Sequence, residues 1–237
     1  MIIEVLYPDA GMLFGDRGNV HYLQRVLPES TFIFTQYPKK PYFVKESVDM
    51  VIMGPTSEKW QLKIIELLRP YQTRIIDMIA DDVFFLITGN ALDVFAKHIE
   101  DEYGNIHPAL DIFDFTVKTN QMKRLNDRIL GTFKDIIMVG FKTQFDQAYG
   151  NNHDHYFIKI VKGFGFNLDS TYDGIQYRNF YGTHMIGPLL ILNPLFTKHL
   201  VESMVKKPVV LPFFEEMMEA YKTRIREFND PKKDSHG

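Results

Sequence analysis

The sequence predicts an α/β domain with a mostly parallel sheet, helices on both faces and an added antiparallel section. Short apolar runs alternate with amphipathic segments as far as about residue 110, which is typical of βα units. These runs indicate strands buried on both faces. Beyond residue 111, extended segments follow one another with turns between them, which favours antiparallel pairing.

The first half contains the parallel strands. A strand is expected within residues 1–7, followed by the glycine-rich turn GMLFGDRGNV and by a helix in VHYLQRVL that Asn19 caps. Further strands are expected in STFIFTQY, VDMVIMGP and DVFFLIT. Helices are expected from about Glu58 and in ALDVFAKHI.

The second half contains the antiparallel section. FDFTVK, GTFKDIIMVGF, YFIKIVKGFGF and IQYRNFYGTHMIGPLLI have the character of extended segments, and a helix over 213–228 closes the chain. We expect one domain over residues 1–228, because no linker or repeat interrupts it. The polar segment 229–237 is expected to be disordered.

Composition excludes several classes of function. The chain of 237 residues has a net charge of −3 and no basic run, which argues against nucleic acid as a partner. No apolar run approaches the ~20 residues of a membrane span, and we expect a cytoplasmic protein. There is no cysteine, which excludes thiol nucleophiles and thiolate metal sites. No cofactor is expected.

Three motifs follow predicted strands: GDRGNV, MGPTSEKWQ and ITGNALD. Active sites of parallel sheets lie beyond the carboxyl ends of strands. ITGNALD has the pattern of a strand-to-helix elbow, a turn that exposes one side chain in many hydrolases. Gly89 is the expected turn residue, so the elbow carries no side chain.

These motifs, in this order, resemble the class I, triad-type glutamine amidotransferases. The similarity is to their cobyric acid synthase-like branch, and most of all to glutaminase subunits of the lipid II isoglutaminyl synthase type. It rests on GDRGNV, MGPTSEKWQ, ITGNALDVFAKHIED and YGTHMIGPLLILNP, and it extends over about residues 1–200. The resemblance implies a flavodoxin-like fold.

The resemblance also implies that the usual chemistry is lost. In the family a cysteine attacks the glutamine amide and a histidine acts as base. Gly89 stands at the place of the cysteine, and Ile186 at the place of the histidine. His184 lies two residues earlier, about 7 Å away along a strand, and is either an alternative base or an ordinary loop or strand histidine. We therefore expect a non-catalytic binding or regulatory subunit.

Binding residues follow from the same resemblance. The amide of Asn90 and the loop at Gly54 are candidates for an oxyanion hole, with Pro55 in place of a family glycine. Arg124 falls where an arginine holds the carboxylate of L-glutamine. Asp93 replaces a glutamine, and it would repel a bound carboxylate or pair with Arg124.

Three alternatives stay open. Thr88 is a candidate nucleophile, with His98 or His184 as its base. The histidines of NNHDHY are either metal ligands or part of a polar loop. The third alternative is a sensor of a small carboxylate. The family implies a Mur-ligase-like synthetase as partner, in cell-wall or cobyric-acid-type amidation.

Overall fold

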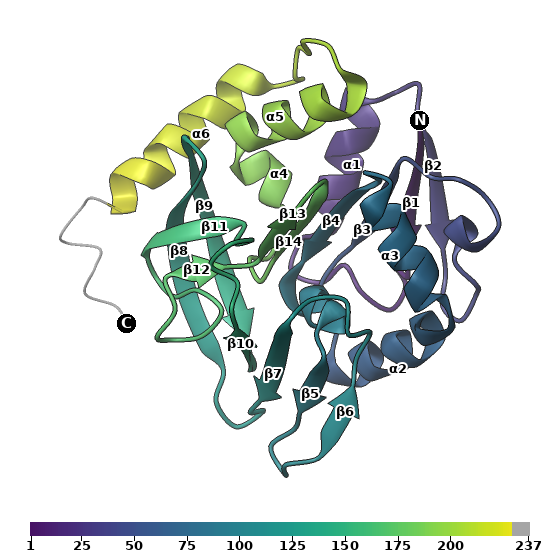
Figure 1. Ribbon diagram of the computed structural model, residues 1–237. Helices are drawn as coiled ribbons and strands as arrows, with labels where there is room; N and C mark the ends of the chain where they lie inside the picture. Colours follow the sequence, from purple (N-terminus) through teal and green to yellow (C-terminus); the bar gives the residue numbers. More distant parts are fainter. Residues whose placement is uncertain (229–237) are drawn as a thin grey trace.

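The computed structural model describes residues 1–228, and a six-stranded sheet in the order β13-β14-β4-β3-β1-β2 forms its centre (Figure 1). The predicted tail lies outside the described residues. β1 pairs in parallel with β2 and β3, and β4 pairs in parallel with β3 and β14. β13 is an antiparallel edge strand. The strands are β1 (Ile2–Leu6), β2 (Thr31–Thr35), β3 (Met50–Met53), β4 (Phe84–Thr88), β13 (Ile175–Tyr177) and β14 (Phe180–Thr183).

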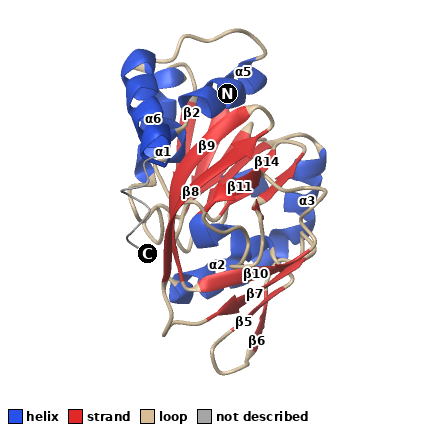
Figure 2. Cartoon of the chain, turned by 90° about the vertical axis from the view of Figure 1, so that its left-hand side faces the viewer, coloured by secondary structure: helices blue, strands red, loops and turns tan. Residues whose placement is uncertain are grey.

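Helices cover both faces of this sheet (Figure 2). Alternate residues of β4 show why: Phe85 and Ile87 belong to the apolar core under α2 and α3, whereas Leu86 belongs to the core under α1 and α5. The helices are α1 (Arg17–Val26), α2 (Glu58–Leu68), α3 (Gln72–Ala80), α4 (Leu189–Leu192), α5 (Pro194–Val205) and α6 (Phe214–Phe228), with 3₁₀ helices η1 (Tyr42–Val44), η2 (Arg69–Tyr71) and η3 (Gly89–Phe95).

The antiparallel section consists of two four-stranded sheets, ordered β10-β7-β5-β6 and β12-β11-β8-β9. The long β8–β9 pair lies against α6, where the hydroxyl of Tyr221 donates to the carbonyl of Ile137 at 2.7 Å. The fold prediction is confirmed. The strands are β5 (His98–Glu100), β6 (Ile106–Pro108), β7 (Phe115–Thr119), β8 (Leu125–Phe133), β9 (Ile136–Gln144), β10 (Asp146–Gly150), β11 (Ile158–Lys162) and β12 (Tyr172–Asp173).

The helix predicted in ALDVFAKHI is wrong. The chain forms only the 3₁₀ helix η3 and then turns into β5. Carbonyls that a longer helix would use are taken by a later segment: those of Val94 and Ala96 accept from the amides of Leu110 and Asp111. The elbow therefore lacks the long helix that would present a strong N-terminal dipole.

The predicted cap at Asn19 is also wrong, because Asn19 lies inside α1. Its side chain instead links elements far apart in the sequence. The amide nitrogen donates to Asp16 Oδ1 at 2.9 Å, and the amide oxygen accepts from the backbone N–H of Leu190 at 2.9 Å. The GDRGNV motif thus ties the start of α1 to α4, directly after β14.

Two absences concern the described residues. Within residues 1–228, no helix is both long and apolar enough to cross a bilayer. The same range contains no group of three or more histidine, aspartate or glutamate side chains that could hold a metal ion, so the metal alternative for NNHDHY is not supported. There the His153 ring lies 3.3 Å from its neighbour Asp154, and both side chains are exposed.

Candidate functional site

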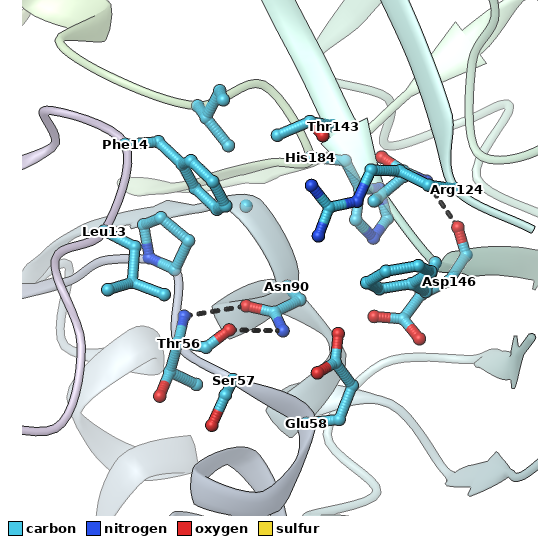
Figure 3. Close-up of a pocket in the computed structure, with 15 residues that line it drawn as sticks. Leu13, Phe14, Thr56, Ser57, Glu58, Asn90, Arg124, Thr143, Asp146 and His184 are labelled. Carbon is cyan, nitrogen blue, oxygen red and sulfur yellow. Dashed lines mark hydrogen bonds between the residues drawn. The ribbon is translucent and has the colours of Figure 1, made fainter. Parts of the chain in front are cut away.

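The carboxyl ends of β3, β4 and β14 meet at a cavity of about 130 Å³ (Figure 3). This is the edge of the sheet where the sequence motifs predict a site. The antiparallel section closes its far side, because β9 ends and β10 begins there. The wall is formed by segments 13–14, 55–58, 89–90 and 143–146, together with Arg124, His184 and Ile186.

Gly89 is the turn residue of the elbow. Its φ of +59° lies in the left-handed region, which glycine adopts without strain, whereas Thr88 before it is still extended. A Cβ atom on Gly89 would lie 2.5 Å from Cβ of Pro55 and 3.4 Å from Cγ2 of Ile186. The position therefore has no side chain, and Pro55 occupies the space for one.

Ile186 lies beside Gly89 at the elbow. It is buried, and its backbone N–H donates to the carbonyl of Phe141 at 3.0 Å. The neighbouring carbonyl of Met185 accepts from the amide of Gly89 at 3.1 Å. Neither Gly89 nor Ile186 carries a group that can attack a carbon atom or transfer a proton.

Thr88 is turned away from the cavity. Its buried hydroxyl donates to Asp16 Oδ2 at 2.8 Å, so the proposed nucleophile has no histidine beside it. Burial raises the pKa of Asp16 to about 7, although hydrogen bonds from Thr88 and Asn19 oppose this. His98, the second candidate base, lies on β5 and does not line the cavity.

His184 is held in a buried chain of charges. Its Nε2 lies 2.8 Å from Asp93 Oδ1, and its Nδ1 lies 3.4 Å from Asp173 Oδ1, which also accepts from Lys142 Nζ at 2.6 Å. Burial lowers the pKa of His184, but the attraction to Asp93 and hydrogen bonds to both carboxylates outweigh it and raise the pKa to about 9. A histidine that is already protonated at neutral pH is a poor general base.

Arg124 lies at the mouth of the cavity, immediately before β8. Its guanidinium carbon lies 4.6 Å from the centre of the Phe145 ring, a cation–π arrangement that holds the side chain over the opening. Figure 3 shows the guanidinium beside His184 and directed across the cavity toward Phe14. Of the predicted ligand-binding residues, Arg124 is the one that brings a free positive charge to the cavity wall.

The sequence was compared with protein families and with known proteins. No family model matches the sequence. Subunit GatD of lipid II isoglutaminyl synthase (glutamine-hydrolyzing) from Staphylococcus aureus is 24% identical over 158 residues, which cover 66% of this chain and 64% of that protein. The match thus spans less than two thirds of the relative.

Two solved structures match over more of the chain. A glutamine amidotransferase, 11% identical, superposes with a TM-score of 0.54 over 86% of this chain and 100% of its own. One from Thermotoga maritima, 10% identical, gives 0.51 over 97% of this chain and 92% of its own. The chain has the fold of the class I glutamine amidotransferases.

Two residues predicted to bind ligand in this amidotransferase fold lie behind the cavity wall. Asp93 is fully buried and pairs with His184 and, at 3.3 Å, with Gln61, so the predicted pairing of Asp93 with Arg124 is wrong. Gly54 does not line the cavity, and a Cβ atom there would lie 2.3 Å from Asp16 Oδ2. The sequence pattern predicts that these residues lie near the cavity, but it does not predict whether they face it.

Asn90 lines the cavity, but its side chain closes the loop predicted to form an oxyanion hole. Its Oδ1 accepts from the amide N–H of Thr56 at 2.9 Å, and its Nδ2 donates to the carbonyl of Thr56 at 2.9 Å. The Thr56 amide is thus engaged within the protein. With Pro55 lacking an N–H, the loop offers no free donor at these two positions.

Sequence reasoning missed Gln144 and Asp146, which are buried polar residues of the cavity wall. Burial raises the pKa of Asp146 well above its usual range. The sequence does contain a signal: TQFDQ places polar residues on both sides of a single phenylalanine where β9 passes into β10. None of the motifs that carry the amidotransferase resemblance lies in this stretch, so the resemblance did not indicate these two residues.

Proposed function

We propose that this protein is a non-catalytic glutamine amidotransferase-like subunit that binds a small carboxylate and regulates or supports a partner. The observation that carries the proposal is the elbow. Gly89 has no side chain, Pro55 fills the space where one would project, and Ile186 faces the same point. Hydrolysis of an amide by the family's route needs a nucleophile and a base in contact.

The ligand proposal rests on Arg124. A guanidinium binds a carboxylate through two parallel hydrogen bonds, and this one projects over a cavity of about 130 Å³. Ligand cavities for drug-sized molecules measure roughly 300–1,000 Å³. A cavity of this size suits L-glutamine or another small carboxylate.

The partner proposal rests on the relative. GatD is named as a subunit of a glutamine-hydrolyzing lipid II isoglutaminyl synthase. We therefore expect this chain to dock onto a Mur-ligase-like amide synthetase, in cell-wall or cobyric-acid-type amidation. Recovery of an ATP-dependent ligase with the tagged chain from its own cells supports this, and fractionation of those cells tests the predicted cytoplasmic location.

The test combines an assay for ammonia release with calorimetric titration of L-glutamine. We expect no ammonia above the spontaneous rate at any glutamine concentration. Any carboxylate that binds should lose affinity about tenfold or more in Arg124→Ala, and not in Lys123→Ala, an exposed cationic neighbour. Glutamine-dependent ammonia release by the pure protein contradicts the proposal and restores the alternative of rebuilt chemistry or of an active ammonia supplier.

A further inference from the structure

The cavity has two ends of opposite character. Leu13 and Phe14 lie on one side, and Arg124 and Asp146 lie on the other (Figure 3). The apolar end continues through Pro55 and Ile186, beside the elbow. A bound molecule would therefore meet hydrocarbon at one end and charge at the other.

Two acceptor atoms at the polar end have no hydrogen-bond partner. They are Oε1 of Gln144 and Oδ2 of Asp146, both enclosed, and nothing in residues 1–228 donates to them. The other polar atom of each side chain is hydrogen-bonded: Gln144 Nε2 donates to the Asp146 carbonyl at 2.5 Å, and Asp146 Oδ1 accepts from the hydroxyl of Thr119 at 2.5 Å. Buried acceptors are rarely left unpaired, which points to a ligand that donates hydrogen bonds. Both atoms are closed to water in this structure, so the wall must shift for such a ligand to reach them.

The charges of the cavity wall are arranged for a zwitterion. Glu58 stands near Asp146 and adds a second carboxyl group to the polar end, while Arg124 supplies a positive charge at the mouth. An ammonium group donates three hydrogen bonds and matches the acceptors. A carboxylate matches the guanidinium.

The apolar end is unsuited to the side-chain amide of glutamine. The side-chain amide of Asn90 and the backbone of Thr56 lie beside the elbow, and they are already paired with each other. An amide placed against Pro55 and Ile186 would lose its bonds to water without replacement, which costs about 1–3 kcal/mol per unpaired group and lowers affinity about ten- to a hundredfold. A hydrocarbon side chain has no such cost there, and it gains from leaving water.

We propose that this cavity binds a small α-amino acid with an aliphatic side chain, in preference to glutamine. Its ammonium group would lie on Gln144 Oε1 and Asp146 Oδ2, its carboxylate on Arg124, and its side chain toward the elbow. The inference rests on the proposed non-catalytic function, and it names the ligand class of that site. It makes the protein a sensor of an aliphatic amino acid.

Calorimetric titration of the full chain with L-valine, L-leucine and L-glutamine tests the inference. We expect saturable binding of at least one aliphatic amino acid, about tenfold or more tighter than that of glutamine. Glutamine binding as tightly as both aliphatic amino acids overturns the specificity. Absence of saturable heat from both aliphatic amino acids overturns the inference altogether.

A matched pair of variants tests the position of the ammonium group. Asp146→Asn should lower affinity for the aliphatic amino acid about tenfold or more, because it replaces the unpaired acceptor and removes its charge. Asp114→Asn makes the same change at an exposed carboxyl group paired with Lys97, and it should leave affinity unchanged. Equal affinities in Asp146→Asn and the wild type overturn the assignment.

Arg124→Ala provides an independent check, since this exposed side chain can be removed without disturbing a core. The variant should lower the affinity for the amino acid but not the affinity for isobutylamine, which carries the amine without the carboxylate. Equal weakening of both overturns the proposed orientation. Ammonia is measured in the same solutions, so that glutamine hydrolysis identifies failure of the proposed function, whereas absence of both ammonia and binding identifies failure of the ligand inference alone.

Discussion

At the scale of single residues, Gly89 and Pro55 fit each other. The glycine supplies a left-handed backbone that other residues adopt only with strain, and the proline lies where a side chain of residue 89 would project. The resemblance predicts Gly89 in place of a cysteine and Pro55 in place of a glycine. In the structure these two residues suit each other, because the proline occupies the space into which a side chain at position 89 would project.

The first prediction concerns this pair. Gly89→Cys should destabilise the protein by ~1–3 kcal/mol for the backbone conformation alone, with a further cost from overlap with Pro55. Adding Pro55→Gly should recover the overlap part. Neither variant should release ammonia from glutamine, because Ile186, the residue beside position 89, cannot transfer a proton. Urea unfolding measures the stability of each variant, and an ammonia assay measures its activity. Activity in Gly89→Cys alone would show that the elbow is open and that another base serves it.

The buried charges around His184 are also a property of single residues. Lys142 is fully buried, with its ammonium group on Asp173 and on the carbonyls of Phe164 and Gly165 at 3.1 and 2.7 Å. Burial lowers the pKa of Lys142, although Asp173 opposes this. The network fixes the position of His184 at the cavity wall.

The second prediction is that Lys142→Met destabilises the fold by ~3–5 kcal/mol, because it leaves Asp173 buried with one partner fewer. The matched control is Lys97→Met, which breaks a solvent-exposed pair with Asp114 and should change stability far less. Denaturant unfolding of both variants compares them. Similar losses in the two would mean that the buried network does not stabilise the fold.

At the scale of elements, the sequence predicts the strands of the parallel sheet and most helices, because each carries its own apolar pattern. It fails after Gly89, where ALDVFAKHI has a helical spacing but η3 ends at Phe95. A short apolar run does not distinguish helix from strand, and the partners that decide come from segment 109–113. Four of the site residues that the sequence predicts line the cavity: Gly89, Asn90, Arg124 and Ile186. Thr88 and Asp93 do not line it, because their side chains form hydrogen bonds with Asp16 and His184.

The third prediction concerns the link between α1 and α4. Asn19→Ala should cost ~1–3 kcal/mol, because the buried N–H of Leu190 loses its acceptor and Asp16 loses a donor. His21→Ala, an exposed change on the same helix, is the control and should be close to neutral. Thermal unfolding of both variants decides. A neutral Asn19→Ala would mean that the two helices are held by apolar packing alone.

At the scale of the whole molecule, three buried groups make stability fall as pH rises, whereas Lys142 and Asp173, whose pKa values are lowered, act in the opposite direction. Burial raises the pKa of Asp16 to about 7 and that of Asp146 well above its usual range, while buried His184 is held by its carboxylate partners at about 9. All three bind protons more tightly in the folded chain than in the unfolded one. The contributions of Asp16, Asp146 and His184 to the free energy of unfolding therefore all decrease as pH rises.

The charges that face Asp146 explain part of the rise in its pKa. After burial itself, the largest cause is the repulsion from Asp93, and a hydrogen bond from Thr119 opposes it. Glu58 adds repulsion and His184 adds a weaker attraction. An ammonium ligand needs the ionised form of Asp146, so an amino acid bound as proposed should bind more tightly as pH rises and should release a proton on binding.

The fourth prediction is that the unfolding midpoint is highest in mildly acidic solution and falls toward pH ~9. Each extra proton held by the folded state costs about 1.4 kcal/mol per pH unit of increase. The window follows from the shifts: Asp16 acts from its ordinary value of 3.8 up to about 7, and His184 from 6.5 up to about 9. Below this window, stability falls again. Lys142 and His184 overcome burial and lower the pKa of Asp173, and the stabilisation from the ionised carboxylate is lost in acid.

A pair of variants tests this prediction. Asp146→Asn should flatten the decline of the unfolding midpoint with pH, whereas Asp114→Asn should not. A midpoint that rises between pH ~6 and ~8 would mean that ionising these groups does not destabilise the folded protein.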